Sequence, residues 1–312
     1  MADITKKPKI KDLSPEAARL VFDKQVSGRR RLKDWRRLLG DVAAFDEAAD
    51  RLRSSSRTWG YTLLVLSFIL SIGTAIVAGA VSDGDLPEWL LYILMPAIPV
   101  SIGLTVFLLI RAWRLKRVDM ANDFRVSLVP FLEAMAEDIE PRAKIQMELN
   151  TAGPVLNKLT SKQEVPPGRF KRVVETVYSD PWLSMEAPLA GGSRLMLHIE
   201  NTYQSQDRYW KNSSGKSKHK CKWKKWVTVT AGLAPNPDLL SFETMETSRP
   251  AEGEKIKLRE RTSGQKAAST RKFKFKSVNE VPEEAVTVED LIGMFLGLAA
   301  KLKDNRAGGV AP

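Results

Sequence analysis

Lysine occurs at every second position in one segment of the C-terminal half of the chain. The residues are Lys216, Lys218, Lys220, Lys222 and Lys224. Because successive side chains of a β-strand point to opposite faces of its sheet, this spacing predicts a strand with five ammonium groups on one face. Such a row can attract and hold anions through charge alone, without a metal or another cofactor.

Two further segments repeat the alternation of basic and other residues that is typical of half-buried strands. One carries Lys255, Lys257 and Arg259, and the other carries Lys272, Lys274 and Lys276. If the three strands share a sheet, their basic side chains form one positive surface. The whole chain is basic as well, with 49 Lys and Arg against 37 Asp and Glu and a net charge of +12.

Three kinds of partner fit a positive surface, and the residues alone do not choose among them. Anionic lipid and an acidic protein would be held by charge. Nucleic acid would also use stacking, for which Trp223, Trp226 and Tyr209 are close in sequence, although most of these rings fall in the apolar phase of the strands. A simpler alternative is that the lysines face solvent and prevent pairing at a sheet edge.

No catalytic motif accompanies this pattern. With two histidines and one cysteine, Cys221, the chain is not expected to form a disulfide framework or a Cys- or His-rich metal site. The motifs of phosphate-binding loops, nucleophile elbows and zinc proteases do not occur. Lys220 and Lys222 flank Cys221 and would lower its pKa, but no general base accompanies it. We expect a protein that is not an enzyme and that uses no metal or cofactor.

Two long apolar runs lie in the N-terminal half of the chain. The first, from Trp59 to Val81, holds 23 residues without a formal charge, and the second, from Trp89 to Ile110, holds 22. At a rise of about 1.5 Å per residue, each run exceeds the roughly 30 Å of a bilayer's hydrocarbon core. We therefore predict a transmembrane hairpin over residues 59–112, with spans at 59–81 and 89–110.

The charges around the hairpin predict its orientation. Lys and Arg do not occur between Arg57 and Arg111, and the turn between the runs contains Asp83, Asp85 and Glu88. Basic flanking residues remain on the cytoplasmic side of a membrane. We therefore expect a multi-pass protein of the cell inner membrane, with both termini in the cytoplasm and the acidic turn outside.

Small residues recur at intervals of four in the first apolar run. Ser71, Ala75 and Gly79 would form a stripe on one helix face, where a second helix can approach closely. The stripe can serve packing against the second span of the same chain or contact between copies of the chain in a homo-oligomer. The sequence leaves both possibilities open.

Helical periodicity is expected on both sides of the hairpin. The predicted helices cover residues 14–26, 29–54, 114–139 and 142–149, and the second and third of them would pack as an antiparallel stalk. The second also carries a basic cluster at residues 29–37, which can lie on anionic headgroups or simply face solvent.

The remaining boundaries follow from changes in composition and period. We expect a basic helical region over residues 1–58, a helical connector over 113–164, a basic β-domain over 165–282, and an amphipathic helix with a tail over 283–312. Thr287 and Asp290 resemble a capping box at the start of that last helix. The helix is expected to pack across the β-domain, with attachment to the bilayer surface as the alternative.

One stretch of the β-domain resembles a known family. It begins with Pro188-Leu189-Ala190-Gly191 and continues with a predicted strand, a polar hairpin that contains tryptophan, and Trp226. This order is similar to the BAM (beside-a-membrane) or GIDE-type domain, over residues 170–245, and it implies a β-rich interaction module next to a membrane. The RING of the family's ubiquitin ligases cannot be built with one cysteine, and Leu195–His198 replaces the family's cysteine- and tyrosine-rich strand. Ligase activity is therefore not implied.

These features predict an α+β membrane protein with a transmembrane hairpin, a cytoplasmic helical stalk and a C-terminal antiparallel β-rich domain. The expected function is binding or scaffolding at the inner leaflet, where the basic β-domain meets anionic lipid, an acidic protein or nucleic acid. The alternative is an oligomeric pore-forming or stress or defence effector that is gated through the β-domain.

Overall fold

The computed structural model of the chain describes residues 13–83, 85–154, 159–242, 254–261 and 264–304. The chain divides into two compact units. Residues 42–119 form the hairpin unit, and residues 14–41 together with the described residues from 120 onward form the sheet unit. The chain therefore starts the sheet unit, leaves it for the hairpin, and returns to complete it.

The sheet unit contains short helices and all of the strands that the structure describes. Its helices are α1 (Pro15–Asp23), the π-helix η2 (Phe124–Leu128), α4 (Val129–Ala134) and α5 (Val288–Ala299), and α2 (Leu32–Ser82) begins in it. Its strands are β1 (Gln25–Arg31), β2 (Lys144–Asn150), β3 (Leu159–Val165), β4 (Arg172–Pro188), β5 (Arg194–Lys211), β6 (Ser217–Ala234), β7 (Leu240–Phe242), β8 (Glu254–Arg261), β9 (Gly264–Val278) and β10 (Leu302–Asp304).

Eight antiparallel strands form one large sheet. Their order is β1-β2-β4-β5-β6-β9-β8, and β3 pairs with the first half of β4 while β2 pairs with its second half. The turn at Asn212–Gly215 joins β5 to β6, and Gly215 adopts a positive φ of 74° there. A separate pair is formed by β7 and β10. Strand β6 is therefore an interior strand over the length on which it pairs with β9, whereas β9 has described partners on both sides only from residue 267 to residue 271.

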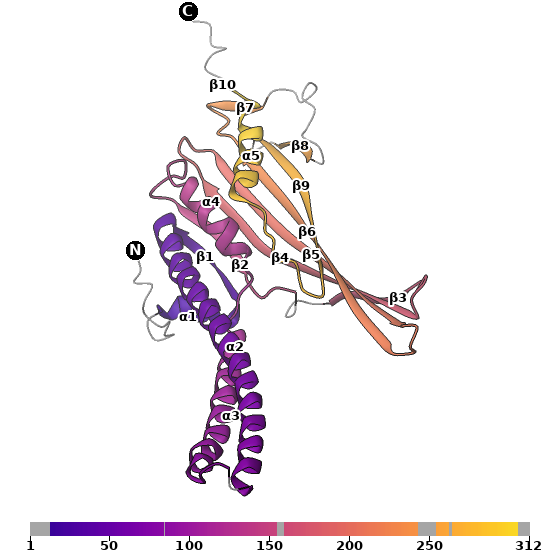
Figure 1. The fold of residues 1–312 in the computed structure, drawn as a ribbon. Helices are drawn as coiled ribbons and strands as arrows, with labels where there is room; N and C mark the ends of the chain where they lie inside the picture. The colour runs from indigo at the N-terminus through magenta and orange to yellow at the C-terminus, as the bar shows by residue number, and fades with distance from the viewer. Residues whose placement is uncertain (1–12, 84, 155–158, 243–253, 262–263, 305–312) are drawn as a thin grey trace, which may run out of the picture. The chain divides into compact units, whose positions relative to one another are not determined.

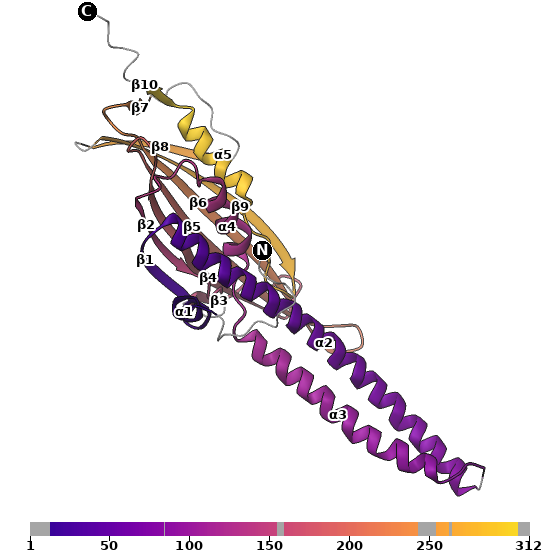
Figure 2. The same cartoon turned by 90° about the vertical axis from the view of Figure 1, so that its left-hand side faces the viewer.

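Helices pack on one face of the large sheet (Figures 1 and 2). The rings of Phe131 in α4 and Phe295 in α5 lie 5.6 Å apart. Trp35, near the start of α2, is fully buried, and its indole N–H donates to the carbonyl of Ile145 in β2 at 3.1 Å. The inward residues of the central strands, such as Val229, are buried as well. We call this helix-packed side the covered face, and the opposite side the open face.

The hairpin unit consists of α2 from Val42 onward and α3 (Trp89–Lys116), which lie side by side and antiparallel (Figures 1 and 2). A Cβ atom at Gly60 would lie 3.0 Å from Leu109 Cδ2, so the two helices approach closely there. The hydroxyls of Ser67 and Ser101 lie 2.9 Å apart across the pair. Both helices are long and apolar enough to cross a membrane, and large apolar side chains such as Phe68 are mostly exposed on their outer surface.

The predictions for the segments on both sides of the hairpin are wrong in two places. Arg29–Arg31, expected in a helix, lie in β1, where Arg31 stands opposite Lys144 of β2. Residues 142–149, expected to be helical, contribute most of β2. The apolar residues of β2 alternate with exposed ones, and this period of two places them on the covered face.

The predicted helix over residues 114–139 is also wrong as a single helix. Helix α3 ends at Lys116, and η2 and α4 follow as short separate elements between Phe124 and Ala134. Because β1 and β2 belong to the large sheet, the predicted domain boundary near residue 164 does not coincide with the boundaries of the sheet unit.

Other predictions are confirmed. The chain is α+β, with an antiparallel sheet and two long apolar helices. Helix α5 begins after Thr287, whose hydroxyl accepts a hydrogen bond from the backbone N–H of Asp290 at 3.3 Å, and it packs on β6 and β9. The tail predicted after Asp304 lies outside the described residues.

Candidate functional site

The strand register places three sets of lysines on the open face. Lys224 of β6 stands opposite Lys276 of β9, and Lys255 of β8 stands opposite Thr270, which shares its face with Lys276. Because paired residues of antiparallel strands point to the same side, the predicted basic positions share one surface. We call this surface the basic face and define it by Lys218, Lys220, Lys222, Lys224, Lys255, Lys257, Lys266, Lys272, Lys274 and Lys276.

Two predicted members differ from the rest. Lys216 precedes β6 and closes the β5–β6 turn, where its backbone carbonyl accepts a hydrogen bond from the N–H of Asn212 at 3.0 Å. Arg259 lies in β8 opposite Lys266, and its side chain lies outside the described part of the structure. Lys266, which the sequence analysis did not single out, joins the basic face through this register.

Ion pairs do not neutralise the basic face in the described part of the chain. Within the described residues, none of its ten lysines forms an ion pair, and the open face of β6, β8 and β9 carries no carboxylate. The charge of Arg208, followed by desolvation and then by the charge of Lys220, lowers the pKa of Lys222. This shift indicates that the basic groups repel one another.

Protection of a sheet edge does not account for the whole surface. Lys222 and Lys224 lie in the part of β6 that pairs with β5 on one side and with β9 on the other. Lys272, Lys274 and Lys276, by contrast, lie in the part of β9 that pairs with β6 but with no described residue of β8, so protection of an edge can account for them. Lysines that prevent edge pairing belong on edge strands. Interior positions therefore need another explanation.

Aromatic rings lie on the basic face at two places. Trp226 follows Lys224 in the same row, stands opposite Lys274, and has the Lys224 ammonium 5.8 Å from its ring centroid. The second place is the edge-to-face pair of Phe170 and Trp210, whose centroids are 5.8 Å apart. The other rings considered from the sequence, Trp223 and Tyr209, lie on the opposite side of the strands, where Trp223 stacks on Tyr178.

Basic side chains that the sequence analysis missed surround the second aromatic place. The guanidinium carbons of Arg208 and Arg169 lie 5.2 and 5.4 Å from the Phe170 centroid. Together with Lys220 and Lys222, these residues line a hollow of about 320 Å³. Arg208 and Trp210 occupy alternate positions of β5, so the sequence indicates that they share a face. Their alignment with the lysines of β6, however, depends on the register of the β5–β6 hairpin.

A larger hollow of about 600 Å³ lies on the open face near the other end of β6. Lys255, Lys257 and Lys266 form part of its wall, Glu148 and Glu186 form another part, and His198 and Thr230 contribute polar groups. His198 stands opposite Ser184 and Thr230 in the register, so it faces this hollow rather than the core. The basic face is thus concave in this region.

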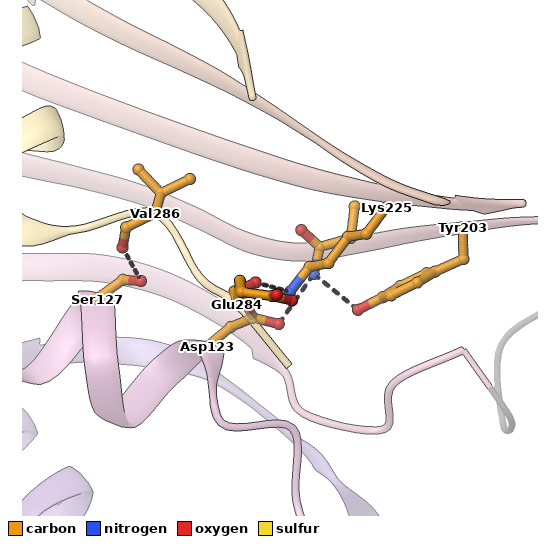
Figure 3. A network of polar contacts seen from close by, with 7 residues as sticks. Asp123, Ser127, Tyr203, Lys225, Glu284 and Val286 are labelled. Carbon is orange, nitrogen blue, oxygen red and sulfur yellow. Dashed lines mark hydrogen bonds and ion pairs between the residues drawn. The ribbon is translucent and has the colours of Figure 1, made fainter. Parts of the chain in front are cut away.

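One lysine of β6 points the other way, and the sequence analysis gave it no role. Lys225 is 1% exposed and lies on the covered face, where its ammonium donates to Asp123 Oδ1 at 2.6 Å and to the carbonyl of Glu284 at 2.9 Å (Figure 3). Asn201 donates to the other carboxylate oxygen of Asp123 at 3.1 Å and lies 3.2 Å from the Tyr203 hydroxyl. Burial, and then the charge of Asp123, raise the pKa of Tyr203.

The expected activation of Cys221 is wrong. Burial, followed by the negative charge of Asp207, raises the pKa of the thiol to about 11. Cys221 stands opposite Asp207, whereas Lys220 and Lys222 point to the other face of the strand. Asp207 also hydrogen-bonds His219 at 2.8 Å. The thiol is therefore protonated at neutral pH and does not serve as an activated nucleophile.

The small-residue stripe does not form the contact between α2 and α3. Ala75 and Gly79 are exposed, and Ser71 is half-buried with its hydroxyl bonded to the carbonyl of Ser67. The side of α2 that faces α3 instead carries Gly60 and the buried Ser67. Packing within the hairpin therefore leaves the stripe uncovered, and its role between copies of the chain remains a prediction.

A group of carboxylates in the hairpin unit resembles a cation site in composition. Asp46, Asp50 and Asp119 bring their oxygens within 4.8 Å of one another. Arg53 forms ion pairs with Asp119 and, at 3.4 Å, with Asp50. A guanidinium thus already supplies positive charge to this group, and the cluster has an evident structural role in joining α2 to the residues after α3.

Comparison of the chain with protein-family models, with curated proteins and with solved structures found no match. The resemblance to the BAM or GIDE-type domain therefore stays a prediction. The function has to be inferred from the basic face, the residues around it and the two apolar helices.

Proposed function

We propose that the chain is a membrane-anchored binding protein of the inner membrane, which captures an anionic partner on its basic face in the cytoplasm. The observation that carries this proposal is the register that assembles ten lysines from β6, β8 and β9 on one face without a carboxylate among them. Such a concentration of charge raises the local concentration of anions and accelerates their association.

Pairing of β1 with β2 supports the hairpin topology. β1 precedes the first apolar run and β2 follows the second, so both strands must lie on the same side of any membrane that the chain crosses. Two spans satisfy this requirement, whereas a single span would separate the two strands. The basic residues beside the apolar runs then place that side in the cytoplasm.

The repulsion within the basic face supports a binding role. Like charges that stand directly opposite each other in a sheet reduce its stability. Lys224 and Lys276 form such a pair, and Lys220 and Arg208 form another. A bound polyanion would relieve this repulsion, which no carboxylate on the open face of β6, β8 or β9 does within the described residues.

Sealed membrane vesicles of known orientation test both parts of the proposal. Inside-out vesicles that contain the chain should bind fluorescent polyphosphate at low salt, and right-side-out vesicles should not. The triple variant Lys222→Gln, Lys224→Gln, Lys276→Gln should lose most of this binding, because it removes adjacent charges from the centre of the basic face. Increased salt should weaken the remaining binding as the Debye length shortens from about 10 Å at 0.1 M to about 3 Å at 1 M.

A matched control separates the basic face from the charge of the whole chain. The variant Lys33→Gln, Arg36→Gln, Arg37→Gln removes the same number of charges from exposed positions of α2 and should bind like the parent chain. Binding to right-side-out vesicles alone would refute the topology. Equal losses in the two triple variants, or no polyphosphate binding at low salt, would refute the role of the basic face.

A further inference from the structure

The basic face has features that the binding of anions by charge alone does not require. Its row of lysines on β6 begins near the Phe170–Trp210 pair and ends at Trp226, so rings are found at both ends of the row. Trp210 stands opposite Lys218, and Lys218 precedes Trp226 by eight residues in β6. At about 3.3 Å per residue, the two aromatic places are therefore about 26 Å apart.

The spacing of the charges suits a linear polyanion. Lysines at every second residue of β6 repeat at about 6.6 Å, which is close to the interval between phosphates of an extended single strand of nucleic acid. The row is bordered by further cations on both sides, with Arg208 opposite Lys220 and with Lys276 opposite Lys224. A chain of phosphates laid along β6 would therefore meet positive groups at each step.

The shape of the open face argues against a bilayer as the partner. Three of its lysines, Lys255, Lys257 and Lys266, line the hollow of about 600 Å³ together with two carboxylates, Glu148 and Glu186. A flat layer of headgroups would not reach the interior of such a hollow, whereas a narrow flexible chain can follow it. Hydroxyl and imidazole groups from Thr230, Thr270 and His198 lie in the same hollow and can hydrogen-bond to bases or sugars.

The rings favour nucleic acid over an acidic peptide. Proteins that bind single strands combine a positive groove along the backbone with aromatic side chains on which bases stack. Trp226 lies beside Lys224 and opposite Lys274. The ring of Phe170 contacts the guanidinium groups of Arg169 and Arg208. Both places thus bring a ring within reach of a base whose phosphate is held by a neighbouring cation. A carboxylate-rich peptide would have no use for these rings.

We propose that the basic face binds a single strand of nucleic acid, with its phosphates along the lysine row of β6 and its bases stacked on Trp226 and on the Phe170–Trp210 pair. This inference rests on the proposed function, because it names the class of anion that the basic face captures. It assigns separate tasks to two sets of residues: the lysines supply charge, and the rings recognise bases.

The first experiment measures the affinity of the full chain in nanodiscs for fluorescent oligothymidylate by anisotropy. Trp226→Leu should weaken binding by about 5- to 150-fold, as expected for the loss of one stacked base. Trp226→Phe should retain most of the affinity, which shows that the fold tolerates a change at this position. Each phosphate contact of a single strand contributes about 0.7 to the slope of log affinity against log salt concentration. The triple variant Lys222→Gln, Lys224→Gln, Lys276→Gln removes three such contacts and should therefore reduce the magnitude of this slope by about 2.

Competition identifies the partner class. Unlabelled oligothymidylate should displace the probe more effectively than polyphosphate of equal charge, and its advantage should disappear in Trp226→Leu. Polyglutamate and vesicles of equal parts phosphatidylglycerol and phosphatidylcholine should compete weakly. If polyphosphate competes as well as the oligonucleotide and Trp226→Leu binds normally, recognition of bases is refuted while capture of anions stands.

Two other results would also overturn the inference. Preferential binding of the anionic vesicles would identify a lipid surface as the partner, and preferential binding of polyglutamate would identify an acidic protein. Tryptophan fluorescence gives an independent measurement, because stacking on Trp226 or Trp210 should quench emission from the parent chain. An oligonucleotide that binds without any quenching would contradict the stacking geometry.

Discussion

Lys224 and Lys225 are neighbours in β6 whose side chains lie on opposite faces of the sheet. Lys224 is on the open face, beside Trp226 and opposite Lys276, with no ion pair within the described residues. Lys225 is buried on the covered face, with its ammonium held by Asp123 and by the carbonyl of Glu284. The same type of side chain thus occurs one residue apart in two opposite electrostatic environments.

This difference separates residues that hold the fold together from residues that are available to a partner. The charge of Lys225 is compensated by the protein itself. Its contacts join β6 to Asp123, which directly precedes η2, and to Glu284, which precedes α5. The charges of the basic face repel one another and form no ion pair within the described residues. A sheet needs only its covered face for stability, so the open face can accept unfavourable charge for another purpose.

The largest expected effect is the loss of the buried ammonium. Lys225→Met leaves the carboxylate of Asp123 buried without its cation, and it should destabilise the chain by about 3–5 kcal/mol. Lys224→Met, one residue earlier, should change the free energy of unfolding by no more than about 0.5 kcal/mol, because its side chain forms no ion pair. Urea unfolding of the detergent-solubilised chain, followed by tryptophan fluorescence, measures both.

A second substitution shows whether the charge of Asp123 causes the loss. Asp123→Asn combined with Lys225→Met should recover most of the stability, since no unpaired charge is then buried. Similar stabilities for the two single lysine variants would mean that the buried ion pair does not hold the sheet to its helices, and the contrast between the two faces would fail.

The sequence contained much of the basic face but little of the buried network. Alternation at Lys218–Lys224 and at Lys272–Lys276 is a local pattern, and local patterns determine which side of a strand a residue occupies. Lys225 is visible as a lysine in the apolar phase of β6. Its partner Asp123, however, is 102 residues away, and only the folded chain brings the two together.

The strand β1 could not be predicted for a similar reason. Its sequence has one apolar residue, Val26, and three consecutive arginines, so it carries no strong strand pattern of its own. Pairing with β2, more than a hundred residues later, decides its structure. In β2 the signal was present, because Ile145, Met147 and Leu149 alternate with polar residues, and the short run was instead taken as helical.

Cys221 provides a chemical test of the two faces, with an expected effect smaller than that of the buried ion pair. Its pKa is raised to about 11 by burial and by Asp207, so its alkylation by iodoacetamide at pH 8 should be about 100-fold slower than that of a free thiol near 9. Asp207→Asn should accelerate the reaction, because it removes the charge that faces the thiol. Lys220→Gln should have little effect, because Lys220 projects from the other face.

The same shift predicts a dependence of stability on pH. Since the thiol ionises more readily in the unfolded chain, the folded chain binds more protons between about pH 9 and pH 11, and the contribution of Cys221 to stability falls as pH rises through this window. Cys221→Ala should remove that part of the alkaline loss. Rapid alkylation of Cys221 at pH 8 would contradict the assignment of its side chain to the face of Asp207. An alkylation rate that increases in Lys220→Gln but not in Asp207→Asn would contradict it as well.

The smallest expected effect has the opposite sign to the first. Lys276→Gln removes one member of the repelling Lys224–Lys276 pair, and it should stabilise the chain by a few tenths of a kcal/mol, at most about 1 kcal/mol. The gain should shrink at 1 M salt, where the Debye length is only about 3 Å. The control Lys33→Gln removes an exposed lysine of α2 and should leave stability unchanged. If Lys276→Gln raises stability while it weakens polyphosphate binding, the lysine is retained for its partner at the expense of the fold. A loss of stability in this variant would instead show that the open face contributes to folding, and the distinction between the two faces would have to be abandoned.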